Sequence, residues 1–179
     1  QEECDWNSSG PNTETDGWGL VLWAARAYVE ASGDTAWLSS STQSGAVYDV
    51  LQGQVAAPLE SNLETSNIVR ADSSIWEVHQ PGKHYAFTTM AAARGFCDMA
   101  AMANKAGKTS DVTHYAMLSQ KVNAAFQSAF LDQQMALGGS IEGLSAQKYV
   151  DGSGAEAFDW NLLADFGGPI ATATLNLFN

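Results

Sequence analysis

The chain has 179 residues, of which 45% are hydrophobic, so it can bury one sizeable core and is best interpreted as one domain or part of one. Its 20 acidic and 8 basic residues give a formal net charge of -12, which repels a nucleic-acid backbone and an anionic membrane surface. No apolar run approaches the roughly 20 residues that span a bilayer. We therefore expect a soluble protein that binds neither nucleic acid nor membrane.

Several features favour a secreted protein. The charged fraction is only 16%, there are six tryptophans, and Asn7 opens a short glycosylation sequon. The start at Gln1 has neither the basic end nor the apolar stretch of a signal peptide, which indicates a processed or trimmed terminus. Cys4 and Cys97 permit one long-range disulfide, and a buried free Cys97 is an equally good interpretation.

Helical periodicity dominates the first part of the chain. Apolar spacing of three and four residues predicts a helix over 16–32, ended by Gly33, with a core stripe of Leu20, Trp23, Ala24, Ala27 and Tyr28. A second apolar pattern over 47–59 predicts a helix that is bent or ended near Pro58. Residues 60–83 lack such a period and predict a long irregular connection.

Two further long helices are predicted after this connection. The first covers about 84–105 and closes at Gly107. The second begins at Thr109 or Ser110 as its N-cap. Their predicted buried residues are Ala92, Phe96, Met99, Ala100 and Ala103 in the first helix and Tyr115, Leu118, Val122, Ala125, Phe126, Ala129 and Phe130 in the second.

The last part of the chain is punctuated by glycine. Glycines between 138 and 154 predict a loop region with room for a hairpin. A short helix is predicted over 155–165, and Pro169 starts a last apolar segment. The whole pattern predicts an all-α fold of paired antiparallel helices.

We expect the chemistry in the connection 60–83, because unstructured connections longer than about 12 to 15 residues are usually functional. Trp76 and Glu77 stand side by side within it. A carboxyl group beside a large aromatic ring can be partly desolvated, which raises its pKa toward that of a general acid. A structural role is also open, and on composition alone it is the more common one: Trp76 anchors the loop and Glu77 faces water.

The string from Asp72 to Val78, which contains Trp76 and Glu77 and is followed by Gly82, His84 and Thr88, resembles the catalytic-acid region of family 15 glycoside hydrolases. That family includes glucoamylases and glucodextranases. Two flanking segments are also similar to the family. One is Asp16-Gly17-Trp18-Gly19, opening a helix that closes at Gly33-Asp34, and the other is the segment 155–163.

The resemblance implies a toroid of six helical hairpins that hydrolyses α-linked glucose with inversion. It makes Glu77 the general acid, with a second carboxylate roughly 6.5 to 9.5 Å away as the base. Asp16, Trp18 and Trp76 would then line the sugar subsites, and His84 would support the loop or touch the sugar. The implied partner is an α-glucan or oligosaccharide, and no cofactor is implied.

The family's pattern is present only in part. One hairpin takes roughly 45 to 50 residues, so this length holds about three hairpins, where the toroid needs six. The family's upstream arginine-aspartate motif and its downstream glutamate-glutamine motif, which carries the base, have no match in this sequence. We therefore expect a partial toroid that carries the acid without the base, is inactive in isolation and has an open apolar edge for the rest of the toroid.

Other interpretations stay open beside this one. The spare carboxylates Glu142, Asp151, Glu156 and Asp159 lie in or near the glycine-rich region, and none is favoured as the base. The chain could be a non-catalytic carbohydrate-binding helical domain or a plain helical interaction domain. Glu77, His79 and His84 could be imagined as metal ligands, but no cluster of Cys or His completes the set, so no metal is predicted.

Overall fold

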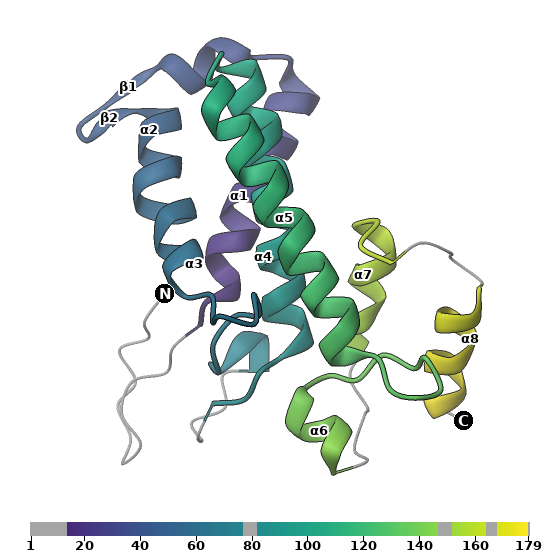
Figure 1. Ribbon diagram of the computed structural model, residues 1–179. Coiled ribbons are helices and arrows are strands. Elements are labelled where there is room, and N and C mark those ends of the chain that lie inside the picture. The colour runs from purple at the N-terminus through teal and green to yellow at the C-terminus, as the bar shows by residue number, and fades with distance from the viewer. Residues whose placement is uncertain (1–13, 77–81, 147–151, 164–167, 179) are drawn as a thin grey trace.

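The computed structural model describes residues 14–76, 82–146, 152–163 and 168–178 (Figure 1). The helices are α1 (Asp16–Ser32), α2 (Val47–Leu51), α3 (Ala57–Ser61), α4 (Ala86–Lys105), α5 (Thr109–Phe130), α6 (Ile141–Ser145), α7 (Glu156–Asp159) and α8 (Pro169–Leu175). The strands β1 (Ser41–Thr42) and β2 (Gly45–Ala46) form a small antiparallel hairpin in which Ser41 lies opposite Ala46. Helix dominates the described residues, so the predicted all-α class is confirmed.

The long helices form two antiparallel pairs (Figure 1). The chain runs along α1, returns through α2 and α3, runs along α4 and returns along α5. Both α1 and α5 pack against α4, so α4 is the central helix. The paired antiparallel arrangement is therefore present in the described residues, and the closed toroid stays a prediction.

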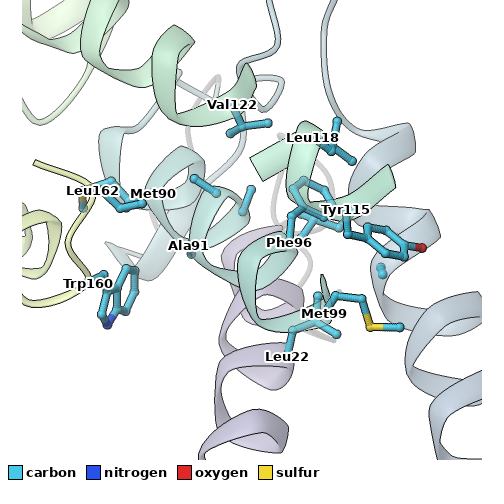
Figure 2. Packing of buried hydrophobic residues seen from close by; sticks show 14 of the residues in the cluster. Leu22, Met90, Ala91, Phe96, Met99, Tyr115, Leu118, Val122, Trp160 and Leu162 are labelled. Carbon is cyan, nitrogen blue, oxygen red and sulfur yellow. The ribbon is translucent and has the colours of Figure 1, made fainter. Parts of the chain in front are cut away.

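The core is built around α4. The residues predicted to face the core in α4 are all buried, and so are the five large ones of α5, namely Tyr115, Leu118, Val122, Phe126 and Phe130. In Figure 2, Leu22 of α1 packs in the same cluster. The ring of Phe96 is nearly parallel to that of Tyr115, with centroids 6.2 Å apart. The periodicity of α4 and α5 thus predicted the core correctly.

Two glycines allow α1 and α4 to cross at close range. A Cβ added at Gly19 would lie 2.3 Å from the carbonyl oxygen of Ala91, and one added at Gly95 would lie 2.9 Å from the Cα of Gly19. The obstacles are backbone atoms, which cannot rotate away as a side chain does. The small residues of both helices are therefore needed for this contact.

The predicted stripe of α1 is wrong. The side chains of α1 that are buried are Asp16, Gly19, Leu22, Ala25 and Val29, which lie about one position away from the predicted stripe. Trp23 and Tyr28, which were predicted to face the core, are 38% and 46% exposed. Helix α1 is apolar on two faces, so its sequence pattern is compatible with burial of either one. The close contact between Gly19 and α4 decides that the face containing Gly19 is buried.

The helix after the hairpin does not end at Pro58. It continues to Ser61, and its irregular part is a π-helical stretch, Gln52–Ala56, that comes before the proline. Pro58 has no N–H to donate to the preceding turn. The N–H of Ala57 instead donates to the carbonyl of Gln52, five residues back, and the helix continues beyond the proline.

Several boundaries also differ from the predictions. Helix α5 begins at Thr109 after the N-cap Lys108, so neither Thr109 nor Ser110 is the cap, and no side chain caps this end. Helix α7 ends at Asp159 because the chain turns into the left-handed region at Asn161, with φ of 55°. Gly107 ends the α4 region with φ of 71°, as predicted.

One further expectation was wrong, and another falls partly outside the described residues. Cys97 lies on an exposed position of α4, not in the core, while Cys4 and the sequon at Asn7 lie outside the described part of the chain. The described part of 138–154 contains α6 and a 3-10 turn, and the hairpin is found at 41–46. Across the described ranges, no helix combines the length and the apolar character needed to cross a membrane.

Candidate functional site

The segment that contains Trp76 and Glu77 is described on both sides of its centre. Glu77 and His79 lie outside the described residues, as does the side chain of Trp76. The site is therefore built from the residues that lead into this segment and out of it. These lie at one end of the helix pairs, beside the first turns of α1 and α4 (Figure 1).

Asp72 lies just before the segment that contains Trp76 and Glu77, and it connects this part of the chain to α1 and α4. Its carboxylate accepts a 3.0 Å hydrogen bond from the backbone N–H of Thr15, just before α1, and bonds of 3.1 and 3.2 Å from the hydroxyl of Thr88 in α4. All three residues are buried. Burial, together with the nearby charge of Asp16, raises the pKa of Asp72 to about 6 against the lowering effect of these bonds.

Asp16 is a second buried carboxylate at this point. It is the first residue of α1 and is 4% exposed, and its Oδ1 atom has no hydrogen-bond partner. Burial raises the pKa of Asp16, although backbone N–H groups at the start of α1 act in the opposite direction. Its carboxylate is buried in this structure, and its expected place in a sugar subsite stays a prediction.

The chain turns sharply immediately before Trp76. Ser74 is fully buried, its hydroxyl has no partner, and its φ of 49° lies in the left-handed region. A serine in this conformation costs on the order of 1 to 3 kcal/mol, and such strain is concentrated at functional sites. The next residue, Ile75, is 39% exposed. The turn therefore carries the chain from the buried Asp72 toward the surface.

The outgoing side of the segment returns directly to Asp72. Asp72 and Lys83 form an antiparallel bridge in which each backbone N–H donates to the other's carbonyl at 3.0 Å. A Cβ at Gly82 would lie 2.8 Å from the Asp72 carbonyl oxygen, so only glycine fits there. The two ends of the segment that contains Glu77 are thus held side by side.

His84 follows this bridge and binds two carboxylates. Its Nδ1 atom lies 2.8 Å from Oε1 of Glu142, and its Nε2 atom lies 3.1 Å from Oε1 of Glu64. Burial lowers the pKa of His84, but the hydrogen bonds to Glu142 and Glu64 outweigh it, so the pKa is raised. Of the two roles expected for His84, these contacts favour support of the segment.

The third segment that resembles the family lies beside the same turn of α4. Trp160, directly after α7, is 6.0 Å from Phe87 and 6.3 Å from Trp23 of α1, measured between ring centroids. Phe87 is the neighbour of Thr88, which binds Asp72. Trp18 is half-buried and packs against the core from α1. The first turn of α4 therefore contacts two of the three segments on which the resemblance rests, through Asp72 and Trp160, and Trp160 in turn packs against Trp23 of α1.

Two surface hollows lie elsewhere. One of about 310 Å³ is lined by residues that include Tyr48, Asp49 and Lys108, and one of about 580 Å³ is lined by residues that include Gln134 and Ser145. No residue predicted for the site lines either of them. The 580 Å³ hollow adjoins α6, which also supplies Glu142 to His84.

The spare carboxylates lie in different places, and their position relative to Glu77 is outside the described residues. Glu142 is engaged by His84, Glu156 and Asp159 lie on α7, and Asp151 lies outside the described residues. Within the described ranges, no group of three or more Cys, His, Asp or Glu side chains is placed to hold a metal.

Sequence reasoning missed the contacts that organise this site. Asp72 lay inside the recognised string without a role, and Glu142 was only a spare carboxylate. Thr15 and Glu64 were not singled out. All of these contacts join residues at least 16 positions apart, and no local pattern marks them.

No protein-family model matches this chain. No curated protein matches it either.

Proposed function

We propose that this chain is the acid-bearing part of a glycoside hydrolase that releases glucose from α-linked glucans or oligosaccharides with inversion. Glu77 is the general acid and protonates the departing glycosidic oxygen. Trp76 offers its indole face to the sugar ring. The hydrolase is a secreted protein whose helical hairpins form a toroid, of which this chain holds part.

The observation that carries the proposal is the bond between Thr15 and Asp72. It joins the start of α1 to the segment that leads to Trp76 and Glu77, although 57 positions separate the two residues. The resemblance rests on these two segments together, and a site shared between them requires that they meet. The burial of Asp72 and the strained turn at Ser74 support a fixed path for the residues that follow.

The other site residues take roles that follow from their surroundings. Asp16 is the proposed sugar-binding carboxylate at the start of α1, where it is buried and its Oδ1 atom has no hydrogen-bond partner. Trp18 remains the proposed sugar-facing residue of α1, since it is only half-buried. His84 supports the segment from its outgoing side.

The proposed reaction needs a base that this chain does not supply. An inverting hydrolase places its second carboxylate roughly 6.5 to 9.5 Å from the acid, with the attacking water between them. No carboxylate of this sequence is assigned to that role. The base belongs to a segment that completes the toroid, so glucose release is expected from the natural protein that contains this chain.

The test is glucose release from a maltooligosaccharide by that natural protein. Proton NMR of the fresh product is expected to show the β-anomer, as inversion requires. Glu77→Gln is expected to reduce the rate by at least about a thousandfold, with an unchanged circular dichroism spectrum. Asp159→Asn, at an exposed carboxylate of α7, is the matched control and is expected to keep full activity.

The same experiment separates the alternative, a non-catalytic carbohydrate-binding domain. The absence of a glutamate-glutamine pair from the sequence favours that alternative. A binding domain would bind the oligosaccharide and release no glucose, with or without Glu77→Gln. Trp76→Ala would then weaken the binding. Full hydrolysis by Glu77→Gln would refute the proposal outright.

A further inference from the structure

We propose that Glu64, His84 and Glu142 form a protonation-dependent clamp that fixes the outgoing end of the segment carrying Trp76 and Glu77. The clamp is a device for positioning this segment, and its effect on catalysis rests on the proposed function. It predicts that the segment is held more firmly when His84 is protonated and both glutamates are ionised than when the ring is neutral.

A neutral imidazole has one N–H and one bare nitrogen, whereas an imidazolium has two N–H groups. An ionised carboxylate only accepts hydrogen bonds. Both ring nitrogens of His84 face carboxylate oxygens, at 2.8 Å from Glu142 and 3.1 Å from Glu64. Only the imidazolium can donate to both, because the neutral ring would turn a lone pair toward one of the two anions.

The charged surroundings of His84 favour the same state. The charged groups that act on the ring are Glu142, from the first turn of α6, and Glu64, from the turn that follows α3. Burial opposes the charge, but these two carboxylates outweigh it and raise the pKa of the ring. His84 therefore stays protonated to a higher pH than an isolated histidine.

The clamp connects three segments that are distant in the sequence. The carboxylate of Glu142 also accepts the backbone N–H of His84 at 3.1 Å, and the N–H of Ile141 donates to the His84 carbonyl at 3.1 Å. On the other side of the ring, Glu64 lies in a turn, and its backbone N–H donates to the carbonyl of Ile68. Backbone bonds already join the segment 82–85 to α6, and the protonated ring adds side-chain bonds to Glu142 and to Glu64 of the turn 63–69.

The clamp is exposed enough to respond to solvent. The side chain of His84 is 24% exposed, and those of Glu64 and Glu142 are 43% and 42% exposed. Ion pairs of this exposure contribute little to global stability, since water competes for the same atoms. The bridge between Asp72 and Lys83 is made of backbone bonds and does not titrate. Deprotonation of His84 therefore loosens the outgoing end without unfolding the protein.

The chain offers a matched control for this clamp. His114 of α5 lies 2.9 Å from Glu60, so it forms another histidine–glutamate pair, on a different helix and remote in sequence from His84. Glu60→Gln breaks that pair and leaves Glu64 and Glu142 in place. Any effect special to the clamp must be absent from this variant.

The experiment is a proton NMR titration of the histidine rings, combined with hydrogen exchange of the backbone amides. In the wild type, the protection factors of the His84 and Ile141 amides are expected to fall about twofold to fivefold as pH rises through the titration of His84. Glu142→Gln and Glu64→Gln are each expected to move that titration to lower pH. Glu60→Gln is expected to leave it in place, and His84→Gln to make the protection independent of pH.

Two results would overturn the clamp: a His84 titration that is the same in the wild type, Glu142→Gln and Glu64→Gln, or protection factors that do not change with pH. Glucose release by the natural protein tests the proposed function separately. If the titration shifts and no glucose is released, the clamp stands and the proposed function falls. If glucose is released and the titration does not shift, the reverse holds.

Discussion

The helices α1 and α4 have similar lengths and apolar contents, yet the fold treats them differently. Helix α4 is buried along most of its length, including Thr88, Thr89 and Asp98 among its polar residues. Helix α1 buries one narrow face that contains Gly19, Leu22 and Val29. On its other side, Val21, Trp23 and Tyr28 are between 38% and 47% exposed.

The difference teaches that an apolar helix face and a buried helix face are not the same property. Both α1 and α5 pack against α4, so most of its apolar residues are covered. In α1 only the stripe that passes Gly19 approaches α4 closely enough to be covered. The hydrophobic pattern identifies a helix and its apolar faces, and the geometry of the crossing decides which face is buried.

The largest expected effect comes from truncating a buried side chain of α4. Phe96→Ala removes a fully buried ring of α4 that stacks on Tyr115. It is expected to lower the free energy of unfolding by about 3 to 5 kcal/mol in urea denaturation. Trp23→Ala in α1 is expected to cost about 1 kcal/mol, because that ring is partly exposed. Equal losses in the two variants would contradict the contrast between the helices.

The next largest effect concerns Asp72, which joins α1 to α4 through Thr15 and Thr88. Its pKa is raised from 3.8 to about 6 by burial, so the folded protein binds an extra proton between about pH 4 and pH 6. This contribution to stability is complete below pH 4 and is lost as pH rises through 6. The loss is about 3 kcal/mol, from two pKa units at about 1.4 kcal/mol each.

Asp72→Asn removes this titration and keeps an oxygen that accepts from Thr15 and Thr88. The difference in unfolding free energy between the variant and the wild type is expected to favour the variant increasingly from pH 4 to pH 7. Urea denaturation at four pH values measures it, and carboxylates that do not interact with Asp72 cancel in the difference. A difference that stays constant with pH would show that Asp72 titrates normally.

A somewhat smaller effect is expected where α1 crosses α4. Gly19→Ala places a methyl group against the backbone of Ala91, which has to shift. The cost is expected to be about 1 to 3 kcal/mol, seen as a lower midpoint of thermal unfolding. Gly53→Ala is the control, because nothing lies within 4 Å of its added Cβ and the helix gains about 0.5 to 1 kcal/mol. If both variants are stabilised, the close crossing is refuted.

The smallest effect is expected on the exposed face of α1. Val21→Ser is expected to change the free energy of unfolding by less than about 0.5 kcal/mol, because the side chain is 47% exposed. Val29→Ser, on the same helix but 1% exposed, is expected to cost about 2 kcal/mol or more. Similar costs at both positions would mean that the face of Val21 is covered in solution.

The parts of the fold that depend on local pattern could be predicted. The bounds of α1 and α4, the core residues of α4 and α5, and the ending glycines Gly33 and Gly107 all follow from spacing and backbone preference along one stretch of chain. The buried face of α1 and the continuation of the helix past Pro58 could not, because they depend on Gly19 meeting Ala91 and on an alternative bond from Ala57 to Gln52.

For the candidate site, the sequence by itself determined which segment carries the aromatic and acidic residues, and it determined the all-α class. Only the tertiary structure brought Thr15 to Asp72 and His84 between Glu64 and Glu142. The physical reason is that a hydrogen bond needs its atoms within about 3 Å, and residues 20 to 58 positions apart reach that distance only after the helices have packed. The raised pKa values of His84 and Asp72 are consequences of that packing, so no local pattern encodes them.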